Sequence, residues 1–226
     1  FWCIRSSRKG PTLEIIDMLI LIAFTVVLMV AELSLPPRGA PDAPVQRERS
    51  AAGTPVAGSH YIRNAYPDAH TPNMDRLFRE GAYLVNSFTT TPVCSPSRAS
   101  LMASRYGTEL GITDWIHPRR EPELGLDPAV VTWPEVLQQN GYATGLVGKW
   151  HLGVPQQYHP TRTGFDYFMG FLEGGTKVKD PVLEKDGQKQ KIEGLTVDII
   201  TDHAVDFLKQ DRDKPFLLCV HYRAPH

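Results

Sequence analysis

The stretch TPVCSPSRASLM at residues 91–102 decides the fold, because it joins a β-favouring run to the start of a helix. Pro96 suits the first helical position, where its missing N–H costs nothing, and Ser95 suits the capping position before it. Cys94 then lies at a helix N-terminus, where N–H groups and the helix dipole favour an anion, and Arg98 follows one turn later. A lone cysteine on a capped helix is commonly a core residue, but this combination predicts a site for anion chemistry.

A second polar cluster lies in GYATGLVGKWHLG at residues 141–153. The preceding string TWPE at 132–135 is a capping box, which predicts a helix to about residue 140, and residues 142–147 are typical of a strand. Ligands of α/β sheets bind beyond the carboxyl ends of strands. Because residues i and i+2 of an extended chain face the same way, we expect Lys149 and His151 to point together as two donors for one anion.

A third polar cluster ends the chain. Thr196 is predicted to cap a helix, and its apolar stripe follows the 3.6-residue period: Val197, Ile200, Ala204, Phe207 and Leu208. The apolar run at 216–220 predicts a buried parallel strand, in which Cys219 is an inert core thiol. Beyond it lie His221 and His226.

These strings resemble the signatures of the type I, formylglycine-dependent, arylsulfatase-like sulfatases. Ser104 stands where the family usually has glycine. The pattern C-x-P-S-R and the leucine-bearing helix after it are otherwise matched by six residues: Cys94, Pro96, Ser97, Arg98, Leu101 and Arg105. The second signature, G-Y-x-T-x-x-x-G-K-W-H-L-G, matches at every defined position. The resemblance covers residues 71–226 and implies the amino-terminal portion of an alkaline-phosphatase-like α/β fold with a doubly wound sheet.

The resemblance also implies a mechanism for hydrolysis of sulfate esters. A formylglycine-generating enzyme would oxidise Cys94, and the hydrated aldehyde would attack the sulfur of a sulfated carbohydrate or an aryl sulfate. Arg98, Lys149 and His151 would stabilise the hydrate and the sulfuryl oxygens. The end of the chain resembles the family's P-F-x-L…P-H segment, in which His226 takes the place of the histidine that enters the active site, whereas His221 does not match it and is expected to be structural. His226 would bind the sulfate or assist proton transfer, so that Lys149, His151 and His226 together bind substrate. A divalent cation, usually calcium in the family, would take the Cys94-derived hydrate as one ligand.

The calcium ligands are where this chain departs from the family pattern. The family places paired aspartates on a first strand ahead of the TPNMDRL segment at 71–77, whereas this chain offers Asp68 there as a weak substitute. A calcium site needs six to eight oxygen ligands. We therefore expect weak calcium binding and a defective or partial sulfatase gene product.

Charge and composition narrow the remaining possibilities. The 226 residues carry a net charge of −1, which gives no global field for nucleic acid, and the three cysteines form neither a disulfide framework nor a zinc-ligand spacing. Residues 1–34, with basic residues ahead of an apolar run at 18–31, are typical of an export signal or a short membrane anchor. We expect export to the periplasm or beyond the cell, or anchoring in a membrane.

The domain prediction follows from these segments. Residues 35–70 are a proline-rich linker or disrupted first strand, and 71–226 are a partial catalytic domain that opens with a short helix at 71–81. Residues 177–191 are predicted to be an exposed loop. The loop residues Asp114, His117 and Arg119 are candidates for lining a substrate pocket, although solvated loop positions account for each of them better.

Three functions stay open at this point. The first is a sulfuric-ester hydrolase. The second is a degenerate, non-catalytic relative that holds sulfated glycans through Arg98, Lys149 and His151. The third is a phosphatase or phosphonate hydrolase of the same superfamily.

Overall fold

The computed structural model describes residues 2–6 by their backbone, and residues 72–73, 76, 89–185 and 187–224 in full. Residues 1–25 and 88–226 form one compact unit, and residues 26–87 form another. The second unit contributes three described residues, Pro72, Asn73 and Arg76, which are helical and exposed. The elements of the first unit, in chain order, are β1 (Trp2–Ser6), α4 (Cys94–Ala103), α5 (Trp133–Gln139), β2 (Ala143–Lys149), the 3₁₀ turns η1 (Gln156–Tyr158) and η2 (Pro160–Arg162), β3 (Tyr167–Phe171), β4 (Val182–Lys185), β5 (Gln188–Lys191), α6 (Thr196–Lys209) and β6 (Phe216–His221).

The strands form one mixed sheet in the order β1-β6-β2-β3-β4-β5. The central strands β6, β2 and β3 are parallel, whereas β1, β4 and β5 run antiparallel to their neighbours. The carboxyl ends of the three central strands therefore lie at the same edge of the sheet. This edge is where a doubly wound sheet binds its ligands.

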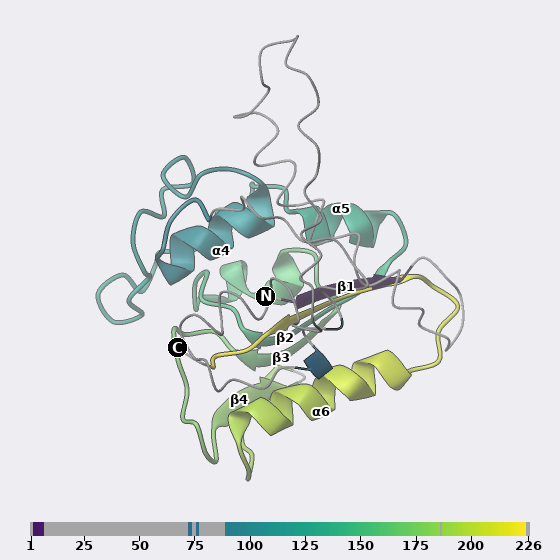
Figure 1. The fold of residues 1–226 in the computed structure, drawn as a ribbon. Coiled ribbons are helices and arrows are strands. Elements are labelled where there is room, and N and C mark those ends of the chain that lie inside the picture. The colour runs from purple at the N-terminus through teal and green to yellow at the C-terminus, as the bar shows by residue number, and fades with distance from the viewer. Residues whose placement is uncertain (1, 7–71, 74–75, 77–88, 186, 225–226) are drawn as a thin grey trace, which may run out of the picture. The chain divides into compact units, whose positions relative to one another are not determined.

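Helices cover both faces of the sheet, with α4 and α5 on one side and α6 on the other (Figure 1). The alternation of side chains along each buried strand explains this arrangement. Leu146 and Cys219 belong to the core on the α4 and α5 side, whereas Val147 and Leu218 belong to the core that contains Phe207 of α6. The sheet is doubly wound, as predicted, and Cys219 is a buried core residue, as expected.

Glycines let the central strands converge at the site edge. Gly148 has φ +113°, and a Cβ there would lie 2.1 Å from the carbonyl oxygen of His221. A Cβ on Gly170 would lie 1.9 Å from the carbonyl oxygen of Gly148. Any side chain at either position would force the strand ends apart. These glycines therefore permit the close spacing of the carboxyl ends of β6, β2 and β3.

The predicted helix before the second signature and the predicted strand within it are confirmed. The capping box holds α5: Thr132 N–H donates to Glu135 Oε2 at 2.8 Å, and Thr132 Oγ1 accepts from Glu135 N–H. The helix ends at Gln139, and Gly141 has the left-handed φ of +83° that suits its role as a stop. The predicted strand and its buried counterpart at 216–220 are β2 and β6.

The predicted cap of α4 is wrong. The helix begins at Cys94, with Val93 as its N-cap, because Ser97 N–H bonds the carbonyl oxygen of Val93. Ser95 Oγ accepts the N–H of Ile116 at 2.9 Å, so this hydroxyl stabilises a distant loop rather than its own helix.

The predicted cap of α6 is also wrong. Leu195 is the N-cap, and the hydroxyl of Thr196, the first helical residue, donates to the carbonyl oxygen of Lys177. Val197 is 42% exposed, and Ile199 is buried instead as part of the apolar stripe.

The predicted loop at 177–191 is wrong in its second half. Residues 182–191 form the β4–β5 hairpin, with Lys185 paired to Gln188 and Leu183 buried. The sequence carries Asp186-Gly187 between the strands, and Gly187 has φ +75°. An Asp-Gly pair is a strong hairpin signal, but the polar side chains of β5 hid it.

Several predicted segments lie outside the described residues: the apolar run at 18–31, the linker at 35–70, and most of the helix at 71–81. In the described part of the chain, no helix combines the length and the apolar character that crossing a membrane requires.

The end of α4 yields a stability prediction. Ser104 is exposed and has φ +54°, a left-handed conformation in which an L side chain is strained by about 1 kcal/mol. Ser104→Gly should raise the free energy of unfolding by about that amount in urea titration. Ala103→Gly, one residue earlier in regular helix, should instead lower it by up to ~1 kcal/mol. Changes of the same sign in both variants would contradict this account.

Candidate active site

The site is built where α4 faces the carboxyl ends of β2 and β6. Cys94 is the first residue of α4 and is half-buried. Lys149 ends β2 and His221 ends β6, and both are buried. The first turn of a ten-residue helix presents N–H groups without intrahelical acceptors, so the Cys94 side chain lies at a position that favours an anion.

Arg98 fastens α4 to the end of β2. Its side chain is 7% exposed, and its Nη1 donates to the carbonyl oxygens of Lys149 at 2.7 Å and Trp150 at 3.4 Å. Burial lowers the pKa of Arg98 to about 10, while the charge of Cys94 acts in the opposite direction. Arg98 therefore stays a cation at neutral pH and joins the two signature segments.

His221 lies directly behind this contact. Its Nδ1 is 3.1 Å from the carbonyl oxygen of Lys149 and 3.3 Å from Nη1 of Arg98. Burial, together with the charge of Arg98, holds the pKa of His221 well below its ordinary value. A neutral imidazole here avoids adding a charge next to the guanidinium, which agrees with the structural role expected for His221.

Two hydrogen bonds through Ile116, together with the backbone at Gly174, set the position of His151. Ile116 N–H donates to Ser95 Oγ at 2.9 Å, and the carbonyl oxygen of Ile116 lies 3.0 Å from His151 Nε2. Because a carbonyl only accepts, Nε2 carries the proton of this hydrogen bond. Gly174 closes the other side, since a Cβ there would lie 2.7 Å from the Cε1 atom of His151. The imidazole of His151 is therefore held between Ile116, which hydrogen-bonds Ser95 of α4, and the segment after β3.

The reasoning that paired Lys149 with His151 does not hold for this backbone. Strand β2 ends at Lys149, and His151 has a left-handed φ of +63°, so residues 149–151 are not a continuous extended segment. Trp150 N–H donates to the carbonyl oxygen of Phe171, and His151 N–H donates to that of Leu172. These hydrogen bonds to the end of β3 set the positions of Trp150 and His151.

Lys149 has a strongly perturbed amine. Burial and the charges of Arg98 and Arg223 together lower its pKa to about 8, while the charge of Cys94 acts in the opposite direction. Cys94, Arg98 and Lys149 are therefore electrostatic neighbours, as an anion site requires.

Calcium does not fit the described residues of this site. In the ranges that the structure describes, no group of three or more His, Cys, Asp or Glu side chains is placed to hold a metal ion. The charged groups that act on Lys149, other than Cys94, are arginines. Calcium takes six to eight oxygen ligands, and a half-buried thiol among cations does not supply them.

The other predicted site residues either make local contacts or lie outside the described residues. His226 and Asp68 lie outside the described residues. Asp114 Oδ1 accepts the N–H of Trp115 at 2.7 Å, and His117 Nδ1 accepts the N–H of Arg119 at 3.1 Å. These contacts are typical of solvated turns.

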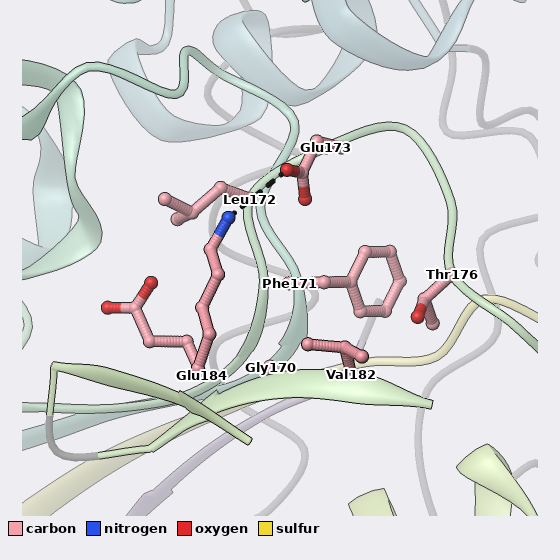
Figure 2. A pocket seen from close by; sticks show the side chains of 8 residues that line it. Gly170, Phe171, Leu172, Glu173, Thr176, Val182 and Glu184 are labelled. Carbon is pink, nitrogen blue, oxygen red and sulfur yellow. Dashed lines mark hydrogen bonds and ion pairs between the residues drawn. The ribbon is translucent and has the colours of Figure 1, made fainter. Parts of the chain in front are cut away.

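Two features at this edge were not predicted. Arg223, two residues past β6, acts electrostatically on Lys149, although a cation after a buried strand was a visible signal. A cavity of about 210 Å³ lies at the end of β3 and is shown in Figure 2. Its charged groups are paired, Lys189 with Glu173 at 3.3 Å and Glu184 with His159 at 2.8 Å.

A comparison with family models matches residues 52–226, more than half of the chain, to the family described as Sulfatase. The chain belongs to the sulfatase family. This sulfatase chain has the α/β architecture of its structural relatives, so the predicted alkaline-phosphatase-like fold is confirmed.

Named relatives support the same assignment. An N-acetylglucosamine-6-O-sulfatase of Bacteroides thetaiotaomicron is 36% identical over 160 residues, which cover 69% of this chain and 26% of the relative. Human arylsulfatase G is 44% identical over 100 residues, which cover 44% of this chain and 19% of the relative. A structure solved in complex with its substrate D-glucosamine-2-N,6-O-disulfate has a TM-score of 0.58 and 36% identity, and the match covers 69% of this chain and 30% of that chain. The sulfatase chain thus spans about a quarter of the first of these relatives.

The Arg98 contact yields a second prediction. Arg98→Lys keeps the charge but loses the planar fork, so it should lower the free energy of unfolding by about 2 kcal/mol. Arg105→Lys is the matched control, because Arg105 is 51% exposed and pairs with Glu109 at the surface; its effect should stay within ~0.5 kcal/mol. Chemical denaturation measures both, and equal effects would contradict the fastening role of Arg98.

The perturbed amine of Lys149 yields a third prediction. A lysine whose pKa is about 8 loses its charge as the pH rises through that value, so affinity for inorganic sulfate should fall above pH 8. Lys149→Arg should retain sulfate affinity up to about pH 10, because guanidinium stays protonated. Titration calorimetry between about pH 7 and 10 measures this, and the same decline in both proteins would assign it to another group.

Proposed function

We propose that this chain forms the nucleophile end of a sulfatase active site that hydrolyses sulfate esters of sugars, with Cys94 converted to formylglycine. The single observation that carries the proposal is the position of Cys94, half-buried at the start of α4 and within the electrostatic reach of Arg98 and Lys149. When formed, the aldehyde hydrate supplies the oxygen nucleophile.

The chain's own residues would hold and orient the reacting group. Lys149, at the end of β2, offers an ammonium within the electrostatic reach of Cys94. The first-turn N–H groups of α4 add partial positive charge on the side of Cys94. Arg98 acts from behind: its Nη1 hydrogen bonds position the backbone of Lys149 and Trp150, while its charge contributes to the field at Cys94. Such preorganised positive charge stabilises the sulfuryl oxygens as negative charge develops on them.

His151 would orient its ring toward the same group. The hydrogen bond from Nε2 to the carbonyl oxygen of Ile116 fixes the tautomer that leaves Nδ1 as the acceptor of the neutral ring. His226 would add a second imidazole for sulfate binding or proton transfer, as the family resemblance implies.

A sulfated carbohydrate is the substrate class that the comparisons favour. One relative is named for a 6-O-sulfated N-acetylglucosamine, and a structural relative was solved with a sulfated glucosamine. Each of these two matches covers 69% of this chain at 36% identity. A sulfated amino sugar is therefore the first substrate to try.

The modification of Cys94 yields the fourth prediction. Co-expression with a formylglycine-generating enzyme should lower the intact mass, because the thiol loses sulfur and two hydrogens and gains one oxygen. Cys94→Ala should show no such change, while Cys219→Ala, which alters the buried core thiol, should still show it. Mass spectrometry of the tryptic peptide that contains Cys94 locates the aldehyde.

Ester hydrolysis by the modified chain separates the remaining functions. Release of sulfate from a sulfated sugar in preference to phosphate from the matching phosphate ester supports the sulfatase. An unmodified thiol in the presence of the modifying enzyme, together with tight binding of the sulfated sugar, would support a non-catalytic glycan-binding protein. Faster release of phosphate would overturn the proposal.

A further inference from the structure

Arg223 places a buried Nε without a hydrogen-bond partner among the described residues at the edge of the site. Arg223 lies two residues past β6. The side chain extends toward the segment after β3, because a Cβ on Gly175 would lie 3.4 Å from Nε. A guanidinium offers five N–H donors in a planar fork. Leaving the buried Nε–H without an acceptor is costly, which points to a missing anionic partner.

Arg223 belongs to the charged cluster around Lys149. The charge of Cys94 acts on both Arg98 and Lys149, and the charge of Arg223 acts on Lys149. Arg98 is in turn occupied by backbone carbonyl oxygens. The cluster therefore contains one cation that is committed to the fold, Arg98, and one, Arg223, whose Nε has no partner in the described part of the chain.

The cation count exceeds what one sulfate ester needs. A sulfate ester carries a single negative charge, and under the proposed function Lys149, the helix N-terminus and the field of Arg98 already face it. Arg223 is a further cation near this edge, and its Nε lacks an acceptor among the described residues. It therefore matches a second anionic group of the substrate better than it matches the reacting sulfate. The cavity at the end of β3 is a weaker candidate for this role, because Glu173 already pairs with Lys189 and Glu184 already contacts His159.

We propose that Arg223 binds a second anionic group of the substrate, a sulfate or carboxylate on the same sugar or on its neighbour, and so selects multiply charged glycans. This inference rests on the proposed function, since it assumes that the reacting sulfate lies against Lys149 and Cys94. Sulfate and carboxylate both present two oxygens that match the guanidinium fork, and the experiment distinguishes them.

The test is a binding panel with the full 226-residue chain. The probes are glucosamine 6-sulfate, D-glucosamine-2-N,6-O-disulfate, and glucosamine 6-sulfate linked to a uronic acid. Calorimetry should give about tenfold tighter binding of a doubly charged probe than of the monosulfated sugar. The tighter of the two doubly charged probes identifies the second group as sulfate or carboxylate.

Variants of Arg223 assign the preference to this side chain. Arg223→Ala should abolish the preference while changing the affinity for the monosulfated sugar by less than about twofold, and Arg223→Lys should retain part of it. Arg105→Ala, which removes an exposed cation elsewhere on the surface, should leave the preference intact. Arg223→Gln keeps the length of the side chain and serves if the alanine variant does not fold.

Each failure has its own signature. An Arg223→Ala variant that weakens all three probes equally would place Arg223 on the reacting sulfate and overturn the inference. Binding of all probes without a preference for two charges would also overturn it, while leaving the proposed function intact. A wild-type chain that binds none of the probes, or a Lys149→Ala variant that binds them as well as the wild type, would overturn the proposed function itself.

Discussion

The buried guanidinium of Arg98 is the contact on which the site depends. A cation that is 7% exposed loses most of its hydration, and several kcal/mol is at stake unless strong acceptors replace the water. The carbonyl oxygens of Lys149 and Trp150 are available as acceptors because β2 ends there and β3 leaves them facing α4. The end of the strand and the position of the helix are thus one arrangement, and moving either would leave a buried charge without its acceptors.

The same contact explains why positive charge accumulates at this edge without unfolding it. Arg98 is stabilised by carbonyl dipoles, and His221 stays neutral because burial and the neighbouring guanidinium oppose its protonation. The desolvation and charge repulsion at this edge then destabilise the charged form of Lys149, whose pKa is lowered to about 8. A bound anion would relieve that destabilisation, so the resting protein is preorganised for a ligand that carries negative charge.

Hydrophobic periodicity and capping signals predicted the helices and strands that hold the site. The features that they missed depend on contacts between residues far apart in the sequence. The capping box at Thr132 and the apolar runs of β2 and β6 are local signals, and they were confirmed. Ser95 misled the prediction because its hydroxyl bonds Ile116, which is far along the chain, instead of its own helix. No local pattern reveals such a partner. The paired motifs fixed the family, but the left-handed backbone of His151 and the reach of Arg223 depend on how β2, β3 and β6 converge.

The segment after β3 lies beside two residues of the candidate site. Gly174 lies against the ring of His151, and Gly175 lies against the guanidinium of Arg223, so two consecutive glycines form a wall beside both side chains. A side chain on Gly174 would move the imidazole, because its Cβ would lie 2.7 Å from Cε1, closer than Cβ atoms in proteins approach their neighbours. A side chain on Gly175 would meet Nε at 3.4 Å, which the arginine can accommodate by a small shift. The structure therefore constrains the segment more tightly beside His151 than beside Arg223, so that under the proposed function substrate preference can vary at a position where the chemistry cannot.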